Sequence, residues 1–289
     1  MSMNEWQMMD LHVHTTASDG QASFDEAVEL AASAGMTAVA ITDHLDPSAS
    51  RGHGAKGAMD AKDAMDAKDA RGVQIAQAGF NDEAGLLEQA RLRTLGPRPI
   101  QVFIGLERGP IPVRLERAVP DLVIASVHYI TEPICVRLGE LFNDAYWQAY
   151  MDEVIRVVEG PQVDVMGHIA GYLPMEPMLK PGSTFDERRE MEREVASRFF
   201  VRDWYERVFR TARDRGIAVE IHCPTKSPSP DIVRLGLAMG ARFTVGSDAH
   251  IKSWIGDVTW GYELLKSMGA DPDSVWSPGR AGQVCGGES

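Results

Sequence analysis

The run Asp10-Leu11-His12-Val13-His14 places two histidines in and after a short apolar segment, and it decides how the rest of the chain is interpreted. In a β-strand, residues i and i+2 point to the same side. His12 and His14 are therefore expected to project together, while Leu11 and Val13 face the other way. Two imidazoles held side by side on a strand supply half of a divalent-metal site. A hydrogen-bonded pair of structural histidines is the alternative, and the later strands discriminate between the two.

Composition sets limits on size and partners. With 289 residues, 44% of them hydrophobic, the chain can bury a large core, and no linker divides it, so we predict a single domain over residues 1–289. The net charge is −13, from 42 acidic and 29 basic residues. This acidic balance argues against a stable nucleic-acid partner and against an anionic membrane surface. A small anionic substrate attracted by metal ions remains compatible with it.

Targeting signals and cysteine usage favour the cytoplasm. The N-terminal residues MSMNEWQMM lack a basic segment followed by an apolar core, so no secretory signal is predicted. No apolar run approaches the length of a membrane span. The three cysteines, Cys135, Cys223 and Cys285, are odd in number and widely spaced, which is typical of free thiols in a reducing compartment. We therefore predict a cytoplasmic protein without a membrane partner. The oligomeric state is not predicted.

After the first strand, short apolar runs alternate with longer amphipathic ones. Ser23 and Glu26 have the spacing of a capping box for a helix that ends near Gly35. Residues 37–41 form the next apolar run, and strand, helix, strand predicts a parallel sheet built from crossover units. The remaining strands are expected at 101–106, 122–127, 163–167, 217–221 and 242–247, and helices at 81–95, at 144–158 and, as one or two helices, within 185–215.

One segment, at about residues 45–79, does not follow this alternation. It contains two copies of Ala-Met-Asp-Ala-Lys-Asp, at 58–63 and 64–69, between glycine-bearing flanks. Two copies are too few for a solenoid. We interpret the segment as an inserted, solvated helix or mobile flap, with charges that cancel. His53, a lone loop histidine, is left out of the predicted site.

A metal-competent side chain stands at or just after the end of each of the seven predicted strands. In parallel α/β folds, the carboxyl ends of the strands are where sites assemble. Strand parity agrees with a site at this edge. If Asp248 points inward, the small residues Gly246 and Thr244 point to the same side and leave room there. The candidates are His12 and His14 on the first strand, His44, Glu107, His128, His168 and His222 on the next five, and Asp248 with His250 on the seventh. Asp19 lies in the turn after the first strand.

The motifs that carry these residues resemble the polymerase and histidinol phosphatase family, called PHP. They are DLHVHTTASDG (10–20), ITDH (41–44), GLE (105–107), SVHY (126–129), MGHI (166–169) and GSDAH (246–250). The resemblance covers most of the chain. It implies an α/β fold, a distorted seven-stranded (β/α)7 TIM-like barrel, and two or three divalent metal ions, with zinc, manganese and iron as the candidates.

The resemblance also implies which residues bind each metal. His12, His14, Glu107 and Asp248 would hold one ion. Glu107 would bridge to a second ion, held also by His128 and His168, and Asp19, His44 and His250 would hold the third. A hydroxide bridging two metals would be the nucleophile, because metal binding lowers the pKa of water to near neutral. Asp10, expected inward beneath His12, is either an acceptor for an imidazole N–H or a buried carboxylate bound to backbone amides.

The end of the sixth strand departs from the family, in which this strand often ends in Glu-x-Asn. Here it reads Glu220-Ile221-His222. His222 either acts as a general acid or substrate contact or fills the place of the asparagine. The predicted catalytic set is Glu107, Asp248 and His222. Lys226, in the proline-rich loop that follows, and Arg108, next to Glu107, are the predicted phosphate ligands.

The predicted function is metal-dependent hydrolysis of a small-molecule phosphate monoester, with histidinol phosphate as the leading candidate. A phosphodiesterase or nuclease acting on nucleotides or oligonucleotides is the alternative, and the acidic composition disfavours it. A metal-binding module without catalysis is a third possibility, against which the complete ligand set argues.

Overall fold

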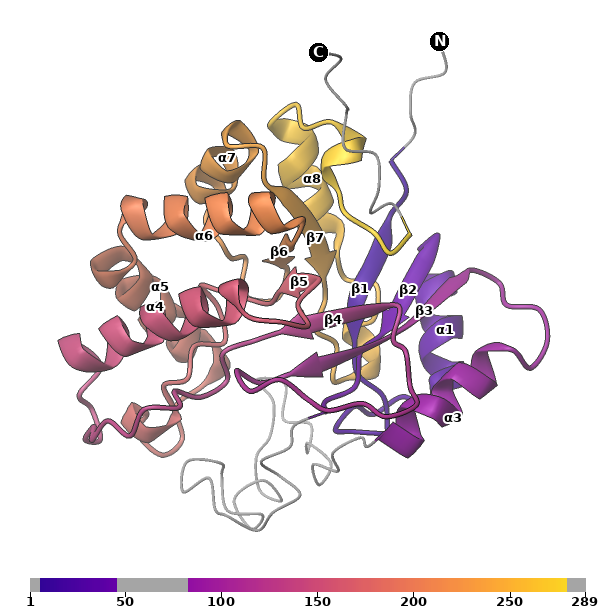
Figure 1. Cartoon of the computed structure of the whole chain (residues 1–289), viewed down its shortest axis with the longest axis horizontal. Helices are drawn as coiled ribbons and strands as arrows, with labels where there is room; N and C mark the ends of the chain where they lie inside the picture. The colour runs from indigo at the N-terminus through magenta and orange to yellow at the C-terminus, as the bar shows by residue number, and fades with distance from the viewer. Residues whose placement is uncertain (1–5, 46–82, 280–289) are drawn as a thin grey trace.

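The fold was examined in a computed structural model, which describes residues 6–45 and 83–279. The predicted insertion at 45–79 lies, except for its first residue, outside the described residues. Seven parallel strands form one sheet in chain order, surrounded by helices (Figure 1). The strands are β1 (Met9–Val13), β2 (Ala38–Ile41), β3 (Gln101–Arg108), β4 (Leu122–Ala125), β5 (Val165–Met166), β6 (Ala218–His222) and β7 (Arg242–Gly246). All seven strands occur where the sequence predicts them.

The first and last strands meet just beyond β7. Val13 forms a parallel bridge with Ala249, and the His14 amide donates to the Ala249 carbonyl at 3.1 Å. The sheet is therefore a nearly closed barrel, as predicted. All the carboxyl ends of its strands face one rim, where parallel barrels build their sites.

Helices cover the outside of the barrel. They are α1 (Phe24–Ser33), α3 (Glu83–Arg93), α4 (Asp144–Glu159), α5 (Phe185–Phe199), α6 (Arg202–Arg215), α7 (Pro230–Ala238) and α8 (Thr259–Ser267), with 3₁₀ turns at Glu176–Met178, Lys252–Trp254 and Pro272–Ser274. The predicted capping box of α1 is present: Ser23 and Glu26 satisfy each other's backbone amides. No helix in these described ranges is both long and apolar enough to cross a bilayer.

Helices α7 and α8 are absent from the sequence-based prediction. Helix α7 begins at Pro230, directly after a proline-rich loop, and the prolines suggested a loop only. Proline is nevertheless well suited to the first helical turn, where its missing N–H has no partner to lose. The charged segment at 185–215 forms two helices, α5 and α6. They are separated at Phe200, whose ring stacks on Tyr150 with centroids 5.4 Å apart.

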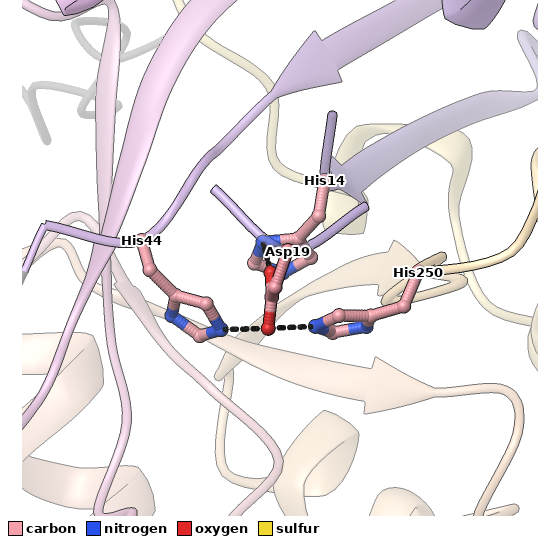
Figure 2. A group of neighbouring side chains, drawn as sticks. All are labelled: His14, Asp19, His44 and His250. Atoms are coloured by element: carbon pink, nitrogen blue, oxygen red, sulfur yellow. Dashed lines mark ion pairs between the residues drawn. The ribbon is translucent and has the colours of Figure 1, made fainter. Parts of the chain in front are cut away.

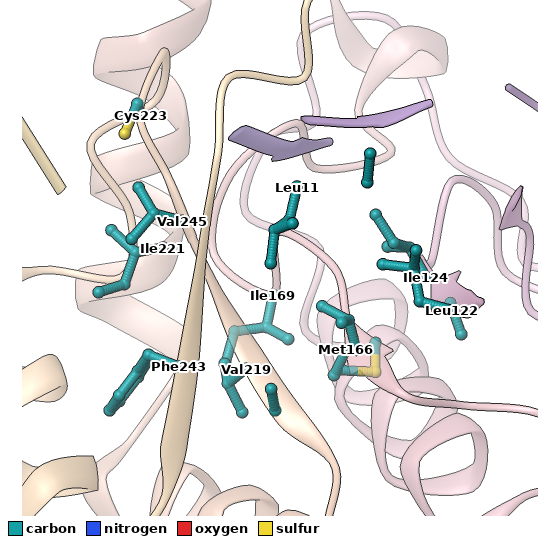
Figure 3. Close-up of a cluster of buried hydrophobic side chains, with 14 of the residues drawn as sticks. Leu11, Leu122, Ile124, Met166, Ile169, Val219, Ile221, Cys223, Phe243 and Val245 are labelled. Carbon is teal, nitrogen blue, oxygen red and sulfur yellow. The ribbon is translucent and has the colours of Figure 1, made fainter. Parts of the chain in front are cut away.

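Close contact between helices and strands stabilises the outer layer. Buried side chains of β6 and β7 pack in one cluster with Cys223 (Figure 3). At Gly261 of α8, an added Cβ would lie 2.5 Å from Cγ1 of Val245, so only glycine lets this helix approach so closely. Gly236 of α7 meets Phe243 in the same way, at 2.5 Å. These contacts fix β6 and β7, and with them the loops that carry the candidate site.

Candidate metal centre

Strand β1 contains a bulge that determines which of its side chains face the site. Asp10 pairs with Val39 and Val13 with Ile41, so three steps along β1 match two along β2. Beyond this irregularity His12 and His14 lie together, with ring centroids 5.1 Å apart, as the strand period predicts. Both rings are fully buried. A bulge changes the direction in which the preceding side chains point.

Asp10 is not an acceptor for the ring of His12, although it accepts a 3.4 Å hydrogen bond from the His12 amide. Its carboxylate accepts hydrogen bonds from the amides of Ser247 (3.0 Å) and Gly256 (2.8 Å) and from the Ser247 hydroxyl (2.6 Å). Of the two alternatives raised by the sequence, the structure supports the buried carboxylate bound to backbone amides. Burial raises the pKa of Asp10 to about 6, because these hydrogen bonds offset only part of the desolvation.

The first candidate group joins β1, β3 and the residue after β7. It consists of His12, His14, Glu107 and Asp248, with one potential ligand atom from each, all within 4.8 Å of one another. Nε2 of His14 lies 3.0 Å from Oδ1 of Asp248, and Nε2 of His12 lies 3.3 Å from Oε2 of Glu107. This is the ligand set that the family resemblance implied for one metal.

The second group shares Glu107 with the first. Oε1 of Glu107 lies 3.1 Å from Nε2 of both His128 and His168, and it accepts a 2.6 Å hydrogen bond from Ser126. Oε2 of the same carboxylate faces His12 of the first group. The two oxygens of Glu107 thus face two different groups, which is the arrangement expected of a bridging carboxylate.

The third group lies around Asp19, in the loop after β1. Its carboxylate is directed between the rings of His44 and His250 (Figure 2), with Oδ2 at 3.6 Å and 3.2 Å from their Nε2 atoms. The structure adds His14 to the three residues that the sequence suggested, because Nδ1 of His14 lies 3.7 Å from Oδ1 of Asp19. His14 therefore takes part in two groups.

The Asp19 loop is held by a second, structural carboxylate. Asp43 accepts hydrogen bonds from the amide and the hydroxyl of Thr15, both at 2.7 Å, and from the hydroxyl of Ser18. Gly20 closes the loop against the backbone of His14, where a Cβ would lie 2.3 Å from the carbonyl oxygen. This local packing fixes Asp19 relative to the histidines.

The charges of the three groups depend strongly on one another. Burial would raise the pKa of Glu107, but the surrounding histidines His128, His12 and His44 outweigh it and hold this pKa well below its usual range. The pKa of Asp19 is also lowered, because the nearby His250 and His44 outweigh the effect of burial. Burial lowers the pKa of His44 to about 4. The carboxylates are therefore ionised, as metal ligands must be.

Two buried nitrogens provide a test of whether this cluster suits metal ions. Within the described residues, neither Nε2 of His12 nor Nδ1 of His14 makes a hydrogen bond. Buried polar atoms are nearly always paired, so such atoms call for an explanation. Both belong to the candidate groups, and imidazole with carboxylate is a donor set that zinc, manganese and iron accept. The residues present therefore fit metal ions.

Glu220, on β6, is a site residue that the sequence analysis did not assign. Its Oε1 accepts a 2.7 Å hydrogen bond from Nδ1 of His12, and its Oε2 accepts a 2.8 Å bond from the amide of His168. Residue parity would have found it, because Glu220 lies two positions before His222 and so faces the same side. It orients two of the candidate ligands.

The remaining predicted residues lie in three different situations. Arg108 is buried, and its guanidinium donates to the carbonyls of residues 109, 161 and 162, outside the three groups, so it is not among the proposed substrate contacts. Lys226 is exposed on the loop after β6 and stays a prediction as an anion contact. His222 is fully buried and contacts Asp248 and Thr225 through its two ring nitrogens. It therefore offers no free donor to a leaving group.

The chain is similar to known proteins in sequence. The PHP domain family model matches residues 10–223. A probable phosphatase of Vibrio vulnificus (strain CMCP6) is 28% identical over 164 residues, which are 54% of this chain and 51% of that protein. A probable phosphatase of Vibrio parahaemolyticus (serotype O3:K6, strain RIMD 2210633) is 25% identical over 192 residues, 61% and 62% of the two chains. The chain thus matches about half the length of the first of these relatives.

Two solved structures share the fold. Histidinol phosphate phosphatase of Lactococcus lactis subsp. lactis Il1403, crystallised with zinc, L-histidinol and phosphate, aligns with a TM-score of 0.60 at 21% identity, over 92% of this chain and 95% of that one. A putative histidinol phosphatase of Listeria monocytogenes aligns with a TM-score of 0.51 at 14% identity, over 88% and 99%. At these identities the likeness establishes the barrel fold alone.

Proposed function

We propose a metal-dependent phosphatase function for this chain, which belongs to the PHP domain family. The observation that carries the proposal is the arrangement of three candidate ligand groups around Glu107 and His14, each of which belongs to two groups. The groups lie close enough together to share these residues, so we infer that two or three divalent ions bind as one cluster. Zinc, manganese and iron are the candidates, and zinc is the first to test because the Lactococcus lactis phosphatase was crystallised with it. A cytoplasmic location stays a prediction.

The proposed ions would supply the chemistry that the side chains alone lack. When bound, they polarise phosphoryl oxygens and make water acidic enough to be a nucleophile near neutral pH. His12, His14, Glu107 and Asp248 would hold one ion, and Glu107 with His128 and His168 would hold the next. His14, Asp19, His44 and His250 would hold the third.

The chain's own residues keep these ligands in position. Ser126 donates to Oε1 of Glu107 and so fixes the carboxylate between the first two groups. Glu220 orients the ring of His12. Asp43 holds the loop that carries Asp19. Such supporting hydrogen bonds remove the freedom of the ligands before substrate binds, which favours the geometry needed for reaction.

A small phosphate monoester is the substrate class that we propose, with histidinol phosphate as the first compound to test. A histidinol phosphate phosphatase that was crystallised with L-histidinol and phosphate shares the fold, and so does a protein described as a putative histidinol phosphatase. Near the second group, the Tyr172 ring lies edge-on to His168 and His222, with centroids 6.1 Å and 5.0 Å away. Lys226, exposed beyond β6, is the proposed contact for the phosphate charge.

The experiment is a substrate panel on protein stripped of metal and then reloaded with zinc, manganese or iron. Histidinol phosphate, other small phosphomonoesters, dinucleotides and oligonucleotides are compared by phosphate release and product analysis. We expect hydrolysis of phosphomonoesters that requires added metal. Preferential cleavage of dinucleotides or oligonucleotides would contradict the proposal and favour a phosphodiesterase. Glu107→Gln, purified identically, is the control that excludes a contaminating phosphatase.

A further inference from the structure

A directional chain of hydrogen bonds ends at the candidate ligand Asp248. Nε2 of His222 lies 3.2 Å from Oδ2 of Asp248, and Nδ1 of His222 lies 2.5 Å from Oγ1 of Thr225. The Thr225 hydroxyl in turn lies 2.6 Å from the hydroxyl of Ser227. His222 is fully buried, and Thr225 and Ser227 are 3% and 6% exposed. These residues are thus sequestered from solvent beside the site.

The direction of each bond follows from what its members are able to donate. An ionised carboxylate only accepts, so Nε2 of His222 carries the proton that it donates to Asp248. In a ring that carries this one proton only, Nδ1 is an acceptor and the Thr225 hydroxyl donates to it. This leaves the Thr225 oxygen to accept from Ser227. One tautomer of His222 satisfies the whole chain.

The backbone and helix α5 hold the loop that supplies Thr225. His222 and Ser227 pair through both of their backbone amides, at 2.8 Å and 3.2 Å. Arg189 of α5 donates to the carbonyls of Pro224 and Thr225. The loop is therefore fixed from two sides, and the orientation of His222 is fixed with it.

The two oxygens of Asp248 have different environments. Oδ1 lies 3.0 Å from Nε2 of His14 and 3.4 Å from Nε2 of His12, within the first candidate group. Oδ2 faces His222. The backbone of Asp248 has φ 46°, a left-handed conformation that is unfavourable for aspartate, so its orientation depends on the surrounding contacts.

We propose that His222 is a positioning residue that holds Oδ2 of Asp248 and thereby directs Oδ1 toward the metal site between His12 and His14. The inference rests on the proposed function, because it assigns His222 to the metal cluster of that function. It takes the place of the general-acid role, because both ring nitrogens are engaged by Asp248 and Thr225. It also distinguishes His222 from a residue that only fills the space of a smaller asparagine.

The test compares three substitutions at this position in the full-length chain. In His222→Gln, the side-chain amide nitrogen reaches about as far as Nε2 of histidine. In His222→Asn, the amide nitrogen reaches only as far as Nδ1. His222→Ala has no side-chain nitrogen. Zinc affinity is measured by competition with a chromophoric chelator, and the coordination is monitored by the absorption spectrum of the cobalt-loaded protein. Turnover of p-nitrophenyl phosphate gives kcat and KM separately, and thermal unfolding of the metal-free variants reports on folding.

We expect the Asn and Ala variants to lose affinity for one metal equivalent by about 10- to 100-fold, the usual cost of losing a residue that orients a ligand. Their cobalt spectra should change, and kcat should fall while KM changes little, because the proposed role of His222 is exerted on Asp248 and not on substrate. The Gln variant should retain most of the affinity and the wild-type spectrum. An Asn variant equal to wild type, or a Gln variant as impaired as Ala, would overturn the inference.

A second measurement does not depend on how the variants fold. In zinc-loaded protein with ¹⁵N-labelled histidine, long-range ¹H–¹⁵N correlation should show His222 with its proton on Nε2. A proton on Nδ1 would overturn the inference. If wild-type protein binds no transition metal, both the proposed function and the inference fail. If it binds metal and the His222 variants are indistinguishable from it, only the inference fails.

Discussion

Nδ1 of His12 lies 2.7 Å from Oε1 of Glu220, although 208 residues separate the two in the sequence. The carboxylate holds the proton of His12 on Nδ1 and leaves Nε2 directed at Glu107, 3.3 Å away. The other oxygen of Glu220 accepts a hydrogen bond from the amide of His168. One buried carboxylate therefore positions ligands of two candidate groups.

Replacing Glu220 with Gln should weaken metal binding while the fold persists. Glutamine keeps an oxygen for one of the two hydrogen bonds but has no charge to hold the His12 proton. We expect the affinity for metal and the turnover to fall by about 10- to 100-fold. Chelator competition and phosphate release measure these quantities.

Asp10→Asn is the matched control, since Asp10 is an equally buried carboxylate that accepts from the amides of His12, Ser247 and Gly256 and from the Ser247 hydroxyl, but not from a ligand ring. One of its donors would lose an acceptor, so the free energy of unfolding should fall by roughly 1–3 kcal/mol. Metal affinity measured well below the melting temperature should change much less than in Glu220→Gln. The reverse order of metal affinities would show that the two carboxylates are assigned wrongly.

Gly246→Ala should disturb the metal site by steric contact. An added Cβ would lie 2.3 Å from Oε1 of Glu220 and 2.7 Å from Cβ of His12, so either both of these groups or the backbone at residue 246 must move. Gly236→Ala produces a similar clash, 2.5 Å from Phe243, away from the site. Both substitutions should destabilise the protein by about 1–3 kcal/mol.

The difference between these two variants lies in metal binding. Only Gly246→Ala should lower the zinc affinity when both proteins are folded, as judged by circular dichroism and chelator competition. Equal zinc affinities in the two variants would mean that the contact between Gly246 and Glu220 does not control the site.

Glu107→Gln should reduce activity more than the replacement of any single histidine. Each oxygen of Glu107 faces a different group, so the substitution weakens both. We expect a loss greater than about 100-fold, beyond the range for residues that only orient a ligand. His128→Ala and His168→Ala are the comparison, assayed with p-nitrophenyl phosphate under saturating metal. Near-normal turnover with metals retained would rule out Glu107 as the bridge.

Purified protein should contain two or three transition-metal ions per chain, as the three candidate groups suggest. Elemental analysis after gentle purification measures this, with chelator-treated protein as the control. Removal of the metals should also lower the melting temperature, because ions that bind only the folded state stabilise it. Less than one equivalent after reconstitution with zinc, manganese or iron would contradict the prediction.

The alternation of apolar and amphipathic runs predicted a parallel sheet of seven strands, and the resemblance to the PHP family implied that this sheet closes into a barrel. Each strand that ends in a metal-competent residue is present, and parallel strands must bring those ends to one rim. Helix α7 was missed because its first turn begins with proline, which elsewhere ends helices. Hydrophobic periods of two residues for strands and 3.6 for helices thus predict the architecture more reliably than they predict where individual helices begin and end.

Parity predicted less of the site where the backbone is irregular. Asp10 accepts from backbone amides and the Ser247 hydroxyl and not from the His12 ring, and it lies where the register of β1 shifts, an irregularity that single-sequence reasoning does not detect. For Arg108, strand parity alone would have argued against a role as a phosphate ligand. It is adjacent to Glu107 in a regular strand, so its side chain points to the opposite side of the strand. Contacts such as that between His12 and Glu220 depend on the three-dimensional arrangement of β1 and β6.

The junction between Val13 and Ala249 has a consequence for the order in which the site forms during synthesis. Glu107, His128 and His168 are all available once residue 168 has left the ribosome. The other two groups need Asp248 or His250, from the far side of the junction. Contacts between such distant parts of a chain form late and slow folding. We therefore expect the nascent polypeptide to take up its full complement of metal only after β7 has docked on β1.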